Sequence, residues 1–90
     1  MDRASFAAAL AAEGYAGPLD RRMEAGQVVP EHSHPFDVRL LVLEGEFILD
    51  QGGTSRRYGP GEAFEVAAGV PHAERFGPEG ATYLVGRRSG

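Results

Sequence analysis

All three histidines of this 90-residue chain fall in two short segments. One residue separates His32 from His34, and His72 follows the sequence Gly-Val-Pro. Side chains two residues apart on a β-strand point to the same side. His32 and His34 can therefore aim two imidazoles at one point, and His72 from another strand can add a third. Imidazole binds Fe, Ni, Cu and Zn well, so the pattern predicts one divalent metal ion (Fe, Mn, Ni, Zn or Cu) with open positions for water or substrate. The alternative interpretation is three unrelated core or surface histidines.

Composition excludes several other kinds of site. The chain has no cysteine, so it contains neither disulfides nor thiolate metal ligands. Its formal charge is −4 with no basic stripe, which argues against a nucleic-acid partner. Its apolar runs fall short of the ~18 residues of a membrane span, and we expect no membrane partner and a cytoplasmic location.

The elements that would position the histidines begin with a short helix over residues 3–13. Alanine dominates this segment and is the best helix former. Asp2 is placed to cap the helix N-terminus and Gly14 to end it. Phe6 and Leu10 share one face. This face either covers a barrel edge or a subunit contact, or simply packs on its own domain.

From residue 19 onward, short apolar or alternating runs are separated by glycine and proline, and the chain has 13 glycines. Several short strands at a spacing of about 8–12 residues are typical of an all-β sandwich or barrel. We expect tight hairpin turns at 44–46 and 50–53 and a frayed tail at 86–90. The predicted strands are 19–25, 38–43, 46–50, 56–58, 63–67, 72–76 and 82–85.

The run Val38–Leu43 is apolar on both faces. Such a strand is either covered on both sides or offers one side to a second subunit. This pattern is the main reason to expect a homodimer.

These features together resemble the cupin superfamily, in its small single-domain, RmlC-like form. Gly26, His32, His34 and Gly45 match the spacing of the first cupin motif, and Gly61, Gly69 and His72 match the second. The resemblance covers residue 19 to about residue 85. It implies a small jelly-roll β-barrel over residues 19–90, preceded by a helix and linker over residues 1–18, in one domain overall.

The chain departs from the cupin motifs at the position of a common metal ligand. Val38 occupies the place of the motif glutamate, while Ala67 and Phe76 replace the proline and asparagine of the second motif. Three alternatives follow: three histidines alone hold the metal, Asp37 or Glu74 supplies a shifted carboxylate, or metal affinity is weak or lost. We favour the site made only of the three histidines.

The resemblance implies a metal-dependent enzyme on a small organic molecule, of dioxygenase or isomerase type. The alternative is a binding or sensing module without catalysis, since a fold does not fix a function. No general acid or base stands out, so we name no catalytic residue. Tyr83 and Arg39 are the residues expected to touch a small-molecule ligand.

Overall fold

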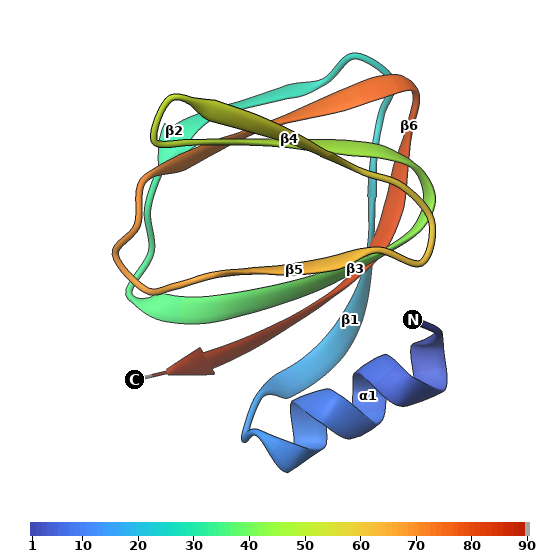
Figure 1. Ribbon diagram of the computed structural model, residues 1–90, viewed down its shortest axis with the longest axis vertical. Coiled ribbons are helices and arrows are strands. Elements are labelled where there is room, and N and C mark those ends of the chain that lie inside the picture. The colour runs from blue at the N-terminus through green and yellow to red at the C-terminus, as the bar shows by residue number, and fades with distance from the viewer. Residues whose placement is uncertain (90) are drawn as a thin grey trace.

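The structure, a computed structural model that describes residues 1–89, is one antiparallel barrel with a helix on its outside (Figure 1). All pairings in the six-stranded sheet are antiparallel; the main path runs β1-β6-β3-β4, with β2 paired to β6 and β5 paired to β3. This confirms the predicted all-β jelly-roll class with a short N-terminal helix. The elements are α1 (Arg3–Ala12), β1 (Ala16–Met23), β2 (Val28–His32), β3 (Phe36–Gln51), β4 (Thr54–Tyr58), β5 (Ala63–Val66) and β6 (His72–Ser89).

Two long strands, β3 and β6, form the frame of the barrel and pair from Phe36–Ser89 at one end to Asp50–Ala73 at the other. The predicted hairpin at 44–46 is wrong, because β3 continues through it with register shifts on both sides of Gly45. Such bulges let a strand bend around a barrel without ending. Gly45 has φ +81°, and a Cβ there would lie 2.1 Å from the carbonyl oxygen of Gly80, so the two strands approach too closely for any side chain.

The remaining turns and ends also differ in part from expectation. The predicted turn at 50–53 is confirmed, since β3 and β4 join through Gly52 and Gly53, both with positive φ. The tail predicted to fray belongs to β6 as far as Ser89, which pairs with Phe36. Strand β2, which carries His32, was not predicted, because Pro30 and the exposed residues around it hide the strand pattern.

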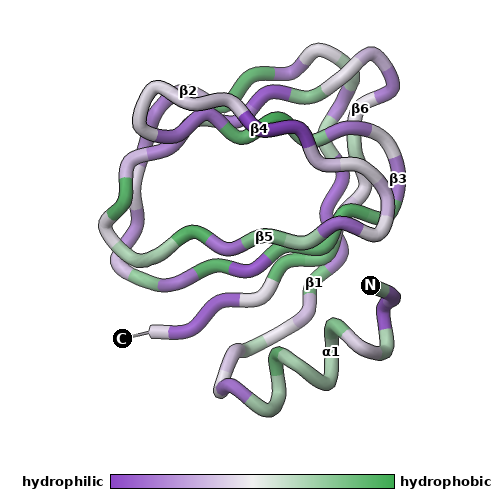
Figure 2. Tube along the Cα trace, viewed as in Figure 1, coloured by the Kyte–Doolittle hydropathy of each residue, from purple (hydrophilic) through white to green (hydrophobic). Residues whose placement is uncertain are grey.

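Two apolar clusters lie on opposite sides of β3. One fills the barrel and includes Val38, Leu40 and Val42. The other lies between β3, β6 and α1 and includes Phe6, Leu10 and Leu41. Figure 2 shows the apolar residues of α1 and of the strands beside it along the chain trace.

Helix α1 therefore packs on its own domain. Asp2 caps it by accepting a hydrogen bond from the Ser5 amide at 2.8 Å, and both Phe6 and Leu10 are buried. Because α1 covers the outer face of β3, the double apolar pattern of this strand is explained within one chain. The apolar pattern of β3 therefore no longer argues for a second subunit, and the homodimer stays a prediction. Helix α1 is too short to cross a lipid bilayer, and it is the one helix in residues 1–89.

Candidate metal centre

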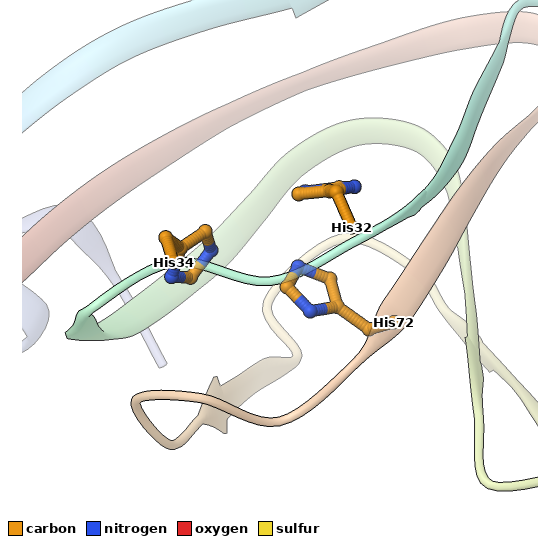
Figure 3. A group of neighbouring side chains, drawn as sticks. All are labelled: His32, His34 and His72. Atoms are coloured by element: carbon orange, nitrogen blue, oxygen red, sulfur yellow. The ribbon is translucent and has the colours of Figure 1, made fainter.

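The barrel brings the three histidines together from two separate parts of the chain. His32 ends β2, His34 follows in the connection to β3, and His72 begins β6. His32 and His72 are direct partners across the β2–β6 ladder. The ring centroids lie 4.3 Å apart for His32 and His72, and 5.0 Å apart for His34 and His72. Figure 3 shows the three rings gathered around one space.

Each imidazole is oriented by a hydrogen bond to a backbone carbonyl two residues away. Nδ1 lies 2.8 Å from the Pro30 carbonyl in His32, 3.1 Å from the Phe36 carbonyl in His34, and 3.0 Å from the Val70 carbonyl in His72. A carbonyl oxygen only accepts hydrogen bonds, so each Nδ1 carries the proton and donates it. All three Nε2 lone pairs are therefore free to bind a metal, in the arrangement that usually orients metal-binding histidines.

The geometry of the donors fits a metal ion. One ligand atom from each histidine lies within 4.8 Å of the others, close enough for one ion to contact all three after small side-chain movements. His72 is 2% exposed, whereas His32 and His34 are half-buried. The ring of Phe36 stacks on that of His34 at 4.4 Å. The site is thus rigid on its inner side and open on its outer side.

A carboxylate lies beside this group. Glu74 Oε2 is 3.5 Å from Nε2 of His72 and 3.9 Å from Nε2 of His32, and the Glu74 side chain is 18% exposed. Glu74 is two residues after His72 on β6, so both side chains point into the barrel. Of the two carboxylates considered from the sequence, Glu74 is the one that the fold brings to the histidines.

The other carboxylate, Asp37, is used elsewhere. Its Oδ1 accepts a hydrogen bond from the Ala68 amide at 2.9 Å, and its Oδ2 accepts one from Arg88 at 2.9 Å. These bonds hold the pKa of Asp37 below its usual value. Val38, at the motif glutamate position, packs in the barrel core. Strand alternation explains both placements, because Val38 faces the interior and Asp37 does not.

The histidines open into a cavity of about 680 Å³, whose wall includes His32, His34, Glu74 and Tyr83. This volume is in the range of small-molecule sites. Tyr83 is 6% exposed, and burial, with a smaller contribution from the Glu74 charge, raises the pKa of its phenol. Tyr83 thus lines the cavity, and its contact with a ligand stays a prediction.

Arg39, the other residue predicted to touch a ligand, does not line this cavity, and its ligand contact stays a prediction. Its guanidinium binds Glu13 at 2.7 Å and Glu65 at 3.2 Å and lies over the Tyr15 ring. The side chain points to the helix side of β3, because its neighbours Val38 and Leu40 occupy the barrel side.

Two arginines on the cavity wall, Arg21 and Arg87, were not among the predicted site residues. Arg21 lies in a predicted strand, where its period-two spacing from Leu19 and Met23 could have placed it on the inner face. Arg87 lies in the tail that we expected to fray, so no signal in the sequence marked it.

Comparison with known proteins agrees with the fold. The family model described as "Cupin domain" matches residues 20–85. The chain therefore belongs to the cupin family, and its three histidines form a group that could hold a metal ion.

Two characterised proteins are similar to this chain. It is 41% identical over 54 residues to dimethylsulfoniopropionate lyase DddQ of Ruegeria pomeroyi, a match that covers 59% of this chain and 27% of the lyase. The crystal structure of that lyase is 34% identical with a TM-score of 0.71, covering 78% of this chain and 36% of the lyase chain. The polyketide cyclase RemF of Streptomyces resistomycificus is 30% identical with a TM-score of 0.69, covering 76% of this chain and 50% of the cyclase.

A protein of unknown function from Rhizobium leguminosarum has a TM-score of 0.74 at 24% identity, covering 84% of this chain and 78% of that one. At that identity the likeness concerns the fold alone. The chain spans well under two thirds of the lyase and of the cyclase, so their activities do not transfer directly.

Proposed function

We propose that this cupin binds one divalent metal ion through Nε2 of His32, His34 and His72, with the Glu74 carboxylate as the fourth protein ligand. The observations that carry this proposal are the matched set of three Nδ1 hydrogen bonds, which leaves every Nε2 free, and the 4.8 Å limit within which one ligand atom of each histidine lies from the others. A set of imidazoles and one carboxylate suits Fe, Mn, Ni, Zn or Cu.

Glu74 belongs in this ligand set because of its surroundings. Its Oε2 faces two Nε2 atoms, and in residues 1–89 no arginine forms an ion pair with it. A carboxylate that is largely buried beside imidazoles needs a cation near it. The metal supplies that cation and explains why the usual glutamate position can be Val38.

We further propose that the metal centre serves an enzyme that converts a small organic molecule. A metal ion held by these residues would supply Lewis-acid chemistry to a substrate oxygen. The wall of the cavity orients the substrate, and its apolar side chains exclude water from it. The Tyr83 phenol, kept protonated by burial, is placed to donate a hydrogen bond to a bound molecule.

The class of reaction is proposed from the resemblance and from the relatives. Dioxygenase and isomerase chemistry follow from the cupin family. The similar proteins are a dimethylsulfoniopropionate lyase and a polyketide cyclase, which adds lyase and cyclase chemistry to the reactions to be assayed. Both relatives are enzymes, and this favours catalysis over binding alone.

Elemental analysis of the purified protein beside His34→Ala tests the metal site. We expect close to one equivalent of metal in the original protein and a large loss in the variant. Ser33→Ala is the matched control, since Ser33 lies between the two histidines and is exposed. Equal metal content in all three proteins, or no metal in any of them after reconstitution, would contradict the proposal.

The enzymatic part needs its own measurement. Turnover of candidate oxygenase, isomerase, lyase and cyclase substrates should depend on the metal and disappear with a chelator. A ligand that raises the melting temperature of the metal-loaded protein without any turnover would instead favour the binding module.

A further inference from the structure

The arginines that line the cavity differ from most other arginines of this chain. All nine basic residues of the sequence are arginines, and most of them pair with carboxylates. Within residues 1–89, Arg21 and Arg87 form no ion pair, and both line the cavity that holds the histidines. The five arginines bound to carboxylates are Arg3, Arg39, Arg57, Arg75 and Arg88.

Arg21 lines the cavity and is an exposed residue. Arg21 on β1 is the direct cross-strand partner of Tyr83 on β6, so the two side chains lie on the same face of the sheet. The Arg21 charge lowers the pKa of the Tyr83 phenol while the Glu74 charge raises it. The three groups therefore face one common space.

Arg87 is held on the side of the cavity nearest to His34. Its guanidinium lies 4.9 Å from the centre of the Phe36 ring, and Phe36 stacks on His34. A cation–π contact restricts the guanidinium without occupying its hydrogen-bond donors. Arg87 thus keeps its donors available at a fixed place.

The charge of the cavity contrasts with that of the whole chain. The protein carries a net charge of −4, yet the cavity wall carries two guanidinium groups against a single carboxylate, that of Glu74. With Glu74 engaged by the metal, the cavity is strongly positive. Partly enclosed sites of one charge attract ligands of the opposite charge.

We propose that the ligand of this cavity is a small organic molecule with a carboxylate group, which Arg21 and Arg87 bind while another part of the molecule reaches the metal centre. Guanidinium groups bind carboxylates through directed, charge-assisted hydrogen bonds. The statement that the ligand reaches the metal centre rests on the proposed function. The contact between the ligand's carboxylate and the protein depends only on the two arginines.

Titration with benzoate and benzamide, followed by amide NMR signals, tests the inference. The two probes have nearly the same shape and differ in charge. We expect benzoate to shift signals around Arg21, Tyr83 and Arg87, and to bind about tenfold or more tightly than benzamide, the effect of a charge-assisted hydrogen bond. Arg21→Gln and Arg87→Gln should each weaken benzoate binding by a similar factor.

Arg22→Gln is the matched control. Arg22 neighbours Arg21 on β1, but its guanidinium donates a hydrogen bond to Thr82, and the residue does not line the cavity. Arg22→Gln removes one positive charge from β1, as Arg21→Gln does, but outside the cavity. Benzoate binding to this variant should therefore stay close to that of the original protein. The dispersion of the NMR spectrum verifies that each variant is folded.

The inference would be overturned by equal binding of benzamide, by an equal loss in Arg22→Gln, or by the absence of benzoate shifts in the cavity. Repeating the titration after treatment with a chelator separates this inference from the metal proposal. Benzoate binding that depends on the metal and ignores both arginines would show capture by the metal alone and contradict the arginine site. Arginine-dependent binding in a protein that never takes up metal would leave the carboxylate site standing and remove the metal centre.

Discussion

Glu74 Oε2 lies 3.5 Å from Nε2 of His72, two residues earlier on the same strand. This contact places a carboxylate at the histidine group from β6, whereas the cupin motif would supply it from β3 at the position of Val38. Both positions point into the barrel, Glu74 beside His72 and Val38 in the core cluster. Residues of either strand therefore present a side chain to the barrel interior.

The variant Glu74→Gln should bind metal at least about tenfold more weakly. Mutation of a residue that only hydrogen-bonds to a metal ligand typically lowers metal affinity about 10–100-fold. Because Glu74 is proposed as a ligand itself, its loss should have at least a comparable effect. The amide keeps the size of the side chain and removes its charge. Competition with a chromophoric chelator measures the affinity.

A second variant distinguishes ligation from a structural role of Glu74. Val38→Glu combined with Glu74→Gln restores a carboxylate at the motif position and should recover much of the lost affinity. Val38→Glu alone is its control. If Glu74→Gln binds metal as tightly as the original protein, then the three histidines suffice and Glu74 is no ligand.

Gly45→Ala should destabilise the barrel far more than Gly53→Ala. Both glycines have left-handed φ, +81° and +79°, but a Cβ at Gly45 would meet Gly80 at 2.1 Å while one at Gly53 has open space. The conformational cost alone is about 1–2 kcal/mol, and the clash adds to it at Gly45. For a domain of this size each kcal/mol lowers the melting temperature by about 4–8 °C. Similar melting temperatures for the two variants would refute the close approach of β3 and β6.

Acid should weaken the links that Asp50 makes between β3, β4 and β6. Asp50 accepts hydrogen bonds from Arg75 at 2.7 and 3.0 Å and one from Ser55, and these lower its pKa from 3.8 to about 2. Because the pKa is lower in the folded state, the stabilisation is complete above pH 3.8 and is lost as the pH falls to about 2.

Thermal unfolding between these pH values measures the effect. Asp50→Asn should be less stable than the original protein at neutral pH and should lose less stability as the pH falls. Glu46→Gln is a control, since it also removes a carboxylate that binds an arginine on β4, Arg57. An unchanged pH dependence in Asp50→Asn would show that its ion pair does not contribute.

Leu10→Ala should cost about 2–5 kcal/mol, the usual range for a buried leucine. Leu10 is fully buried, and its two δ methyl carbons would lie 2.7 and 2.9 Å from a Cβ placed on Gly86. Alanine is the better helix former, so any loss reflects packing of α1 on the barrel. Chemical denaturation measures it, and metal content should stay the same because α1 is remote from the histidines. A stability equal to that of the original protein would mean that α1 contributes little to the fold.

The sequence by itself determined the class of fold and singled out the three histidines that the fold brings together. Turn residues and short alternating runs predict an antiparallel barrel because they report local conformation. The cap at Asp2 and the turn at Gly52–Gly53 are local in the same way. The spacing of His32 and His34 matches the first cupin motif, but His34 lies outside β2, in the connection to β3, so strand alternation alone does not place its imidazole.

Only the tertiary structure decided which carboxylate joins the histidines and which arginines reach the cavity. The sequence offers both Asp37 and Glu74 as possible metal ligands. In the structure, the Asp37 carboxylate faces Arg88 and the Glu74 carboxylate faces His72. Strand β3 passes through Gly45 instead of turning, because Gly80 of a strand far along the chain packs against it. These features depend on register between distant strands, and a shift of one residue would turn each side chain to the other face.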